Sequence, residues 1–126
     1  MNAPMLGILG ARRYAEGIFP DRTISVVPTA FGDQPVIMIR HEENDIVWIP
    51  RFGWGDDTPA DQVNHRAMIA AFYLLGVDRV ITLNGFGTMD TQRIPVGQWA
   101  VLADRLKLFN WGPLTMFTGP GWIRAD

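Results

Sequence analysis

The order of the apolar segments constrains the fold more than any other feature. Residues 45–50 and 79–83 are short runs of apolar and β-branched residues, and the segment between them carries apolar residues at helical spacing. A strand, a helix and a strand in this order form a βαβ unit, whose two strands run parallel. The sequence therefore predicts the α/β class.

A second pair of segments makes the predicted sheet mixed. Residues 35–40 and 45–50 flank a short polar stretch and indicate an antiparallel pair joined by a turn, while residues 6–9 form another short strand that ends in Gly10. We expect a mixed central β-sheet flanked by helices. A chain of 126 residues that is 48% hydrophobic can bury one core, so we expect a single domain over residues 1–126.

The predicted helix begins at Thr58 and ends before Gly76. Thr58 is a suitable N-cap, Pro59 suits the first helical position, and Gly76 is a natural stop. The residues that recur at helical spacing are Val63, Ala67, Ala70, Ala71 and Leu74. From Trp111 to Asp126 the chain is rich in glycine, proline and tryptophan without a period, which predicts no regular structure there.

Composition excludes several classes of function. The chain has 11 Lys and Arg against 13 Asp and Glu, with no basic run, so we expect no nucleic-acid partner. No segment reaches the roughly 18 apolar residues of a membrane helix, and the first residues do not resemble a leader, so we expect a cytoplasmic protein. There is no cysteine, and His41 and His65 lie far apart, so we expect no metal site and no cofactor.

Three glycine-containing loops leave the predicted strands at residues 10–13, 51–57 and 84–88. Ligands of parallel α/β sheets bind at the carboxyl ends of the strands, so these loops would converge on one site. The polar residues that this convergence would bring together are Arg12, Arg13, Arg51, Asn84 and Thr88. Arginines with neutral hydrogen-bonding groups predict an anion site, with phosphate as the ligand.

Seven short motifs follow one another along the chain. They are residues 7–10, 29–32, 49–53, 63–69, 75–81, 84–89 and 113–117. Their order and spacing resemble the nucleoside phosphorylase superfamily, and most closely the N-terminal half of 5′-methylthioadenosine and purine nucleoside phosphorylases. Residues 63–69, for example, read Val-Asn-His-Arg-Ala-Met-Ile, where the family has Ile-Asn-Tyr-Arg-Ala-Asn-Ile.

The resemblance implies a chemistry and an assembly. Family members cleave the glycosidic bond of a purine nucleoside with phosphate and form trimers or hexamers. The resemblance places Arg51 at the family's phosphate arginine and Asn84 where members carry a phosphate-binding threonine or an asparagine. It also implies that Asn64, His65 and Phe86 lie on the nucleoside side of the site or at a subunit interface. His65 faces either the core or a subunit interface in the predicted helix, which favours a packed histidine over a catalytic base.

The departures from the family imply lost activity. The family's phosphate loop reads Gly-Gly-Thr-Gly or Gly-Gly-Ser-Gly and holds backbone amides against the anion, whereas residues 10–13 read Gly-Ala-Arg-Arg, so an arginine would fill the phosphate's space. Phe52, Trp54 and Asp56 stand where the family has histidine and basic residues. The known enzymes are longer, and their C-terminal half supplies much of the base pocket. We therefore expect a truncated phosphorylase-like domain that is inactive alone.

Two groups of residues have alternative interpretations. Arg51 either contacts an anion or forms a surface ion pair with Asp56 or Asp57. The aromatic residues either stack against a base or fill a core or an interface. They are Phe52, Trp54, Trp111 and Trp122.

Three functions remain open at this point. The chain is a shortened, catalytically degenerate subunit that assists or regulates a catalytic partner in a phosphorylase-type heteromer. Alternatively, it is the active half of a split or altered nucleoside phosphorylase or hydrolase completed by a second chain. In the third interpretation it is a binding module whose Arg12, Arg13 and Arg51 hold a nucleotide or another anion without turnover.

Overall fold

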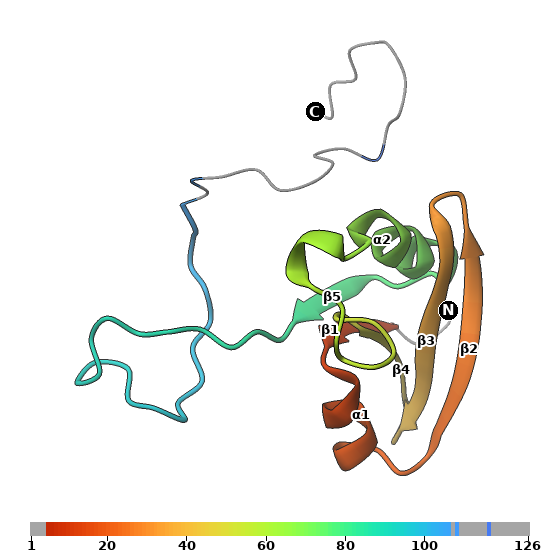
Figure 1. Ribbon diagram of the computed structural model, residues 1–126. Helices are drawn as coiled ribbons and strands as arrows, with labels where there is room; N and C mark the ends of the chain where they lie inside the picture. The colour runs from red at the N-terminus through yellow and green to blue at the C-terminus, as the bar shows by residue number, and fades with distance from the viewer. Residues whose placement is uncertain (1–4, 107, 109–115, 117–126) are drawn as a thin grey trace.

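The computed structural model describes residues 5–106, 108 and 116 (Figure 1). Eight elements are formed before residue 83, and the rest of the described chain has no helix or strand. In chain order they are β1 (Leu6–Gly10), α1 (Arg12–Ile18), β2 (Arg22–Thr29), β3 (Gly32–His41), β4 (Asn44–Pro50), the 3-10 helix η1 (Ala60–Gln62), α2 (His65–Leu74) and β5 (Arg79–Thr82).

The strands form one mixed sheet in the order β2-β3-β4-β1-β5. β2, β3 and β4 are antiparallel neighbours, whereas β1 pairs in parallel with β4 on one side and with β5 on the other. The predicted mixed sheet is confirmed. The two strands of the predicted βαβ unit, β4 and β5, are parallel as expected, with β1 inserted between them.

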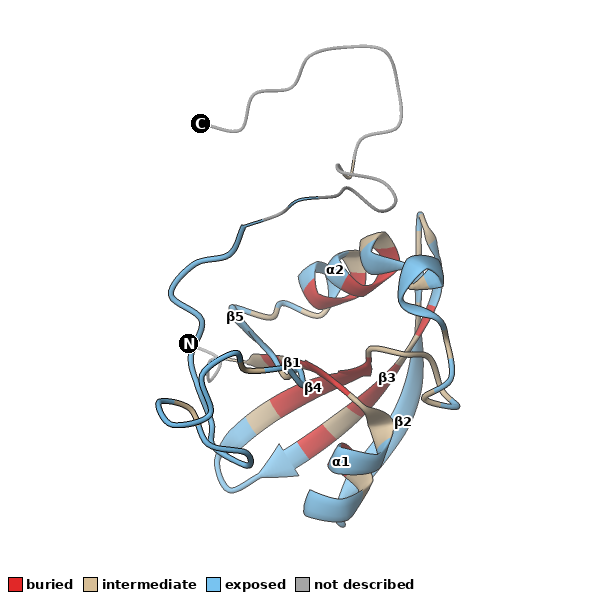
Figure 2. Ribbon diagram, turned by 60° about the vertical axis from the view of Figure 1, so that its left-hand side comes forward, coloured by how far each residue is buried: buried red, intermediate tan, exposed pale blue. Residues whose placement is uncertain are grey.

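Each face of the sheet is covered by one helix (Figure 2). Side chains alternate between the faces of a strand, so neighbouring residues of β4 enter different clusters. Val47 and Ile49 pack with Phe72 and its neighbours on α2, and Ile46 and Trp48 pack on the other face with Ala15 of α1. This double coverage makes β4 the most deeply buried strand of the sheet.

The start of the predicted helix is wrong. After Thr58 the chain makes only the three-residue η1, Val63 is extended, and α2 begins at His65 with Asn64 as its N-cap. The Asn64 side chain accepts a hydrogen bond from the amide of Ala67 at 3.1 Å and donates one to the carbonyl of Phe31 at 2.8 Å. A cap that also holds the β2–β3 turn fixes the helix start by tertiary contact. Gly76, with φ 73°, follows the helix as predicted.

Two elements were not predicted. α1 buries only Ala15, so its residues give no helical stripe of apolar side chains. β2 is an edge strand with mainly exposed side chains, and it contains Pro28, which an edge strand tolerates. Both elements depend on the sheet beside them rather than on their own periodicity.

Several predictions concern parts of the chain with little structural description. The predictions for Trp111, Trp122 and the tail from 111 to 126 lie outside the described residues, as does the 113–117 motif apart from Met116. Within the described part, no helix has the length and apolar character needed to cross a membrane. The same part of the chain contains no cluster of three or more His, Cys, Asp or Glu side chains that could hold a metal.

Replacement of Asn64 tests which residue caps the long helix. We expect Asn64→Ala to lower the free energy of unfolding by about 1–2 kcal/mol, because it removes the cap and the bond to Phe31. Thr58→Ala, at the cap that the sequence predicted, serves as the matched control and should cost less. Urea unfolding followed by circular dichroism measures both, and an equal or larger loss in Thr58→Ala would contradict this assignment.

Candidate functional site

The loops that leave β1 and β4 lie side by side at one end of the sheet. Gly10 is in register with Pro50, and its carbonyl accepts the amide of Arg51 at 2.9 Å and the indole N–H of Trp48 at 3.3 Å. A Cβ at Gly10 would lie 2.7 Å from the Trp48 ring, so only glycine allows this approach. The predicted convergence of the first two loops is confirmed.

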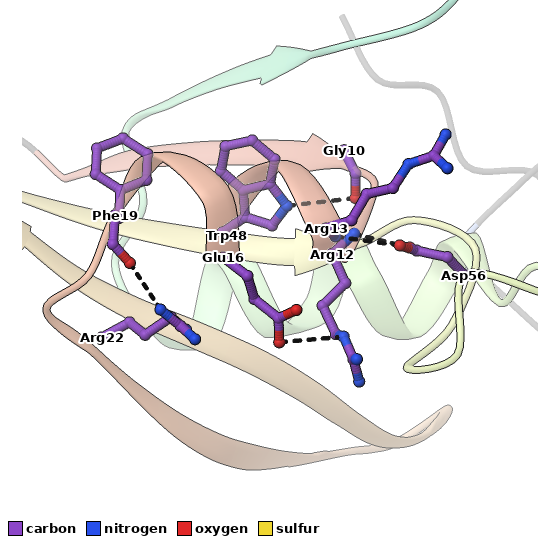
Figure 3. Close-up of polar contacts among 8 residues, drawn as sticks. All are labelled: Gly10, Arg12, Arg13, Glu16, Phe19, Arg22, Trp48 and Asp56. Atoms are coloured by element: carbon purple, nitrogen blue, oxygen red, sulfur yellow. Dashed lines mark hydrogen bonds and ion pairs between the residues drawn. The ribbon is translucent and has the colours of Figure 1, made fainter.

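A carboxylate of the 51–57 loop accepts hydrogen bonds from two backbone amides of the 10–13 loop. Oδ1 of Asp56 accepts the backbone N–H of Arg12 at 2.7 Å, and Oδ2 accepts that of Arg13 at 3.1 Å (Figure 3). Asp56 has φ 56°, a left-handed conformation that aspartate tolerates better than most residues. Both amides are therefore bonded within the chain. No pattern in the sequence predicted this contact.

The arginine side chains of the first loop turn away from these amides (Figure 3). Arg12 pairs with Glu16, with Nε 3.3 Å from Oε1, and its guanidinium lies 5.0 Å from the ring centroid of Trp54. The guanidinium of Arg13 lies 5.4 Å from the centroid of Tyr14. The prediction that an arginine fills the phosphate position is wrong, because the group bonded to these amides is the Asp56 carboxylate.

Arg51 has no carboxylate partner among the residues that the structure describes. The ion pairs found there are Arg12–Glu16 and Arg40–Asp45, so the predicted alternative of a pair with Asp56 or Asp57 is not formed. The Arg51 guanidinium lies 5.0 Å from the ring centroid of Phe52 instead. Of the predicted anion-binding arginines, Arg13 and Arg51 have guanidinium groups without a carboxylate partner in the described chain.

His65 and Asn64 lie at the start of α2. Partial burial and the nearby positive charge of Arg51 lower the pKa of His65. His65 is the first residue of the helix and is exposed overall, although part of the ring is covered, so the predicted position in the core is wrong. The alternative position at a subunit interface stays a prediction. Both polar atoms of the Asn64 amide serve the cap and the β2–β3 turn, which gives this side chain a structural role.

The third loop starts at the same end of the sheet but leaves it. The amide of Leu83 donates to the carbonyl of Leu9 at 2.8 Å, and the chain then runs away from the sheet (Figure 1). Asn84 and Phe86 are exposed, and the Thr88 hydroxyl bonds only its near neighbour Asp90. The structure therefore does not bring Thr88 and Phe86 to the other two loops.

No family model matches this chain, but several known proteins are similar to it. It is 29% identical to the S-methyl-5′-thioadenosine phosphorylase of Pyrococcus abyssi over 93% of this chain and 46% of that protein. It is 28% identical to a probable S-methyl-5′-thioinosine phosphorylase of Methanopyrus kandleri over 89% of this chain and 43% of that protein.

A solved structure shows the same fold. The model superimposes on a methylthioadenosine phosphorylase from an antarctic soil metagenomic library with a TM-score of 0.58 and 20% identity, over 65% of this chain and 30% of that chain. The chain spans less than half the length of the curated relatives it matches. By sequence and fold, this chain resembles part of the methylthioadenosine and purine nucleoside phosphorylases.

Proposed function

We propose that this chain is a catalytically degenerate subunit of a phosphorylase-type complex, in which it assists or regulates a catalytic partner. The observation that carries the proposal is the bond of the Asp56 carboxylate to the amides of Arg12 and Arg13. By resemblance, these amides are the ones that hold phosphate in active relatives. Here they hold an anion that belongs to the chain itself.

The negative charge of Asp56 further disfavours phosphate binding at the amides of Arg12 and Arg13. A phosphate that approached the β1–α1 loop would have to displace a carboxylate held by two hydrogen bonds, one half-buried and one exposed, each contributing about 0.5–1.5 kcal/mol. It would also meet like charge, and two unit charges 4 Å apart repel by roughly 1–4 kcal/mol between bulk water and a protein surface. The loop is therefore closed to phosphate by bonding and by charge.

The other residues predicted to bind phosphate do little to replace the bonded loop amides. Arg12 is paired with Glu16 and lies against Trp54. The Thr88 hydroxyl is hydrogen-bonded to the backbone of Asp90 in a local turn. Phosphorolysis gains its rate from holding phosphate, sugar and base in register. Without the loop amides, the guanidinium groups of Arg13 and Arg51 do not do this. These contacts support a subunit without turnover of its own, and they weaken the interpretation as a binding module built on Arg12, Arg13 and Arg51.

One observation favours a second candidate function, the active half of a split or altered phosphorylase or hydrolase. Arg51 is partly buried at the carboxyl end of β4, it has no carboxylate partner in the described chain, and its charge reaches His65. A second chain that supplied the base site could use this guanidinium for phosphate. In that case Arg51 and Asn84 would carry the phosphate contacts of the composite site.

Replacement of Asp56 tests the closed loop. Glycine accepts the left-handed φ of this position, so Asp56→Gly removes the carboxylate without backbone strain. We expect it to lower the free energy of unfolding by about 1–3 kcal/mol through the two lost hydrogen bonds. Asp57→Gly, which changes the neighbouring carboxylate, is the matched control and should cost less in the same urea titration.

The same proteins test phosphate directly. A ligand at ten times its Kd stabilises a protein by about 1.4 kcal/mol, which raises the Tm by several degrees. We expect phosphate to leave the Tm of the parent chain unchanged relative to chloride at equal ionic strength, and to raise that of Asp56→Gly. A rise in the parent chain would show that its loop is open, and the first proposal would then fail in favour of the second.

The pH dependence of His65 tests the electrostatic contact with Arg51. Loss of the positive charge in Arg51→Ala should raise the pKa of His65 towards its usual value of about 6.5. Because the folded pKa is lowered, the unfolded chain binds more protons between the two pKa values. His65 therefore contributes stability above about pH 6.5 that is lost as the pH falls through the folded pKa.

NMR titration of the histidine ring protons measures this shift. An unchanged His65 titration in Arg51→Ala would show that the guanidinium does not act on this ring.

An activity assay separates the two candidate functions. We expect the isolated chain to release no adenine from methylthioadenosine in phosphate. The assay is repeated with the chain mixed with a full-length methylthioadenosine phosphorylase, with Arg51→Ala as the matched variant. If the parent chain and Arg51→Ala change the turnover rate of the full-length enzyme equally, the result supports the regulatory subunit. If additional phosphate-dependent turnover requires Arg51, the result supports the split enzyme.

A further inference from the structure

The described chain leaves one edge of its sheet open. β5 is the last strand in the sheet order and pairs only with β1, so its outer backbone groups have no strand partner in the described structure. Its four residues are all exposed, and Val80 and Ile81, on opposite faces, are 45% and 48% exposed. An open strand of this kind is a template for the addition of another strand.

The segment that follows β5 carries large apolar side chains that are exposed in the described structure. We call residues 84–106 the arm. In Figure 1 it leaves the sheet, and its backbone hydrogen bonds in the described structure are local turns, such as Ile94 to Asp90 and Gln98 to Pro95. Its large apolar side chains are exposed, and they are Phe86, Met89, Val96, Trp99, Val101, Leu102 and Leu106.

One stretch of the arm complements β5 in sequence. Residues 101–105 read Val-Leu-Ala-Asp-Arg, and residues 78–82 read Asp-Arg-Val-Ile-Thr. In an antiparallel register with Arg79 opposite Asp104, Asp78 lies opposite Arg105 and Ile81 lies opposite Leu102. Residues directly opposite in an antiparallel pair share a face, so this register matches both charge pairs and an apolar pair.

We propose that residues 101–105 of a second copy of this chain add to β5 as an antiparallel strand, and that two copies exchange their arms in this way. The charge complementarity selects the register, and reciprocal exchange forms the contact twice. Gly85 and Gly87 lie in open space directly after β5 and provide a hinge for the arm.

The exchange covers apolar side chains that are exposed in the described structure. Val101 and Leu102 are 98% and 75% exposed, and Val80 and Ile81 on β5 are 45% and 48% exposed. Because reciprocal exchange forms the contact twice, each contact has to bury about 600 Å² to reach the roughly 1,200 Å² of the smaller specific interfaces. The contact uses no residue of the Asp56 loop, so it stands or falls independently of the proposed function.

The first experiment is a charge swap read by light scattering after size exclusion. We expect the parent chain to have twice the 14.1 kDa mass of one chain at micromolar concentration. Arg79→Asp and Asp104→Arg should each raise the dimer dissociation constant at least tenfold, and the double variant Arg79→Asp/Asp104→Arg should restore it. Arg93→Asp, an exposed arm residue outside the register, is the control and should remain dimeric.

The second experiment distinguishes exchange from an arm that folds back on its own sheet. The chain has no cysteine, so Ile81→Cys and Leu102→Cys can be made as separate proteins, mixed and oxidised. We expect a disulfide between the two chains, and no such product when Ser25→Cys on β2 replaces Ile81→Cys. A monomeric parent, a charge swap without rescue, or a cross-link that forms only when both cysteines are on one chain would overturn the proposal.

Discussion

The parallel pairing of β1 with β4 is the constraint on which the rest of the structure depends. It places Gly10 beside Pro50 and lets the Gly10 carbonyl accept both the amide of Arg51 and the indole N–H of Trp48. The two loops then leave the sheet together, close enough for Asp56 to reach the first amides of α1. A change of register by one residue would separate all of these groups and turn the side chains to opposite faces.

The sequence predicted the parts of the fold that carry their own signal. β1, β3 and β4 are apolar because both faces of the sheet are buried, and β5 is a β-branched run, so their positions could be found within a few residues. α1, β2 and the start of α2 could not be found, because each is held by a contact with a distant segment. The side chain of Asn64 illustrates this, since one of its two bonds reaches Phe31.

The sequence could predict where the candidate site lies, but not that its backbone amides are bonded by Asp56. Strand order and glycine loops indicated that residues 10–13 and 51–57 would meet, whereas the bond from Asp56 depends on the path of a turn-rich loop. The only local signal was an aspartate after Gly53 and Gly55, in a segment able to adopt left-handed conformations. That signal is common to many turns, and only the structure shows which amides the carboxylate meets.

The closed loop and the open edge lie on neighbouring strands of the same sheet. β1 lies between β4, whose faces are covered and whose loop is bonded internally, and β5, whose faces and outer edge are exposed. Among the described residues, the Asp56 carboxylate bonds the amides at the first position, whereas the apolar side chains of β5 stay exposed at the second. Burial of apolar surface is favourable in proportion to its area, and for this reason the proposed exchange adds a strand at β5 rather than a ligand at β1.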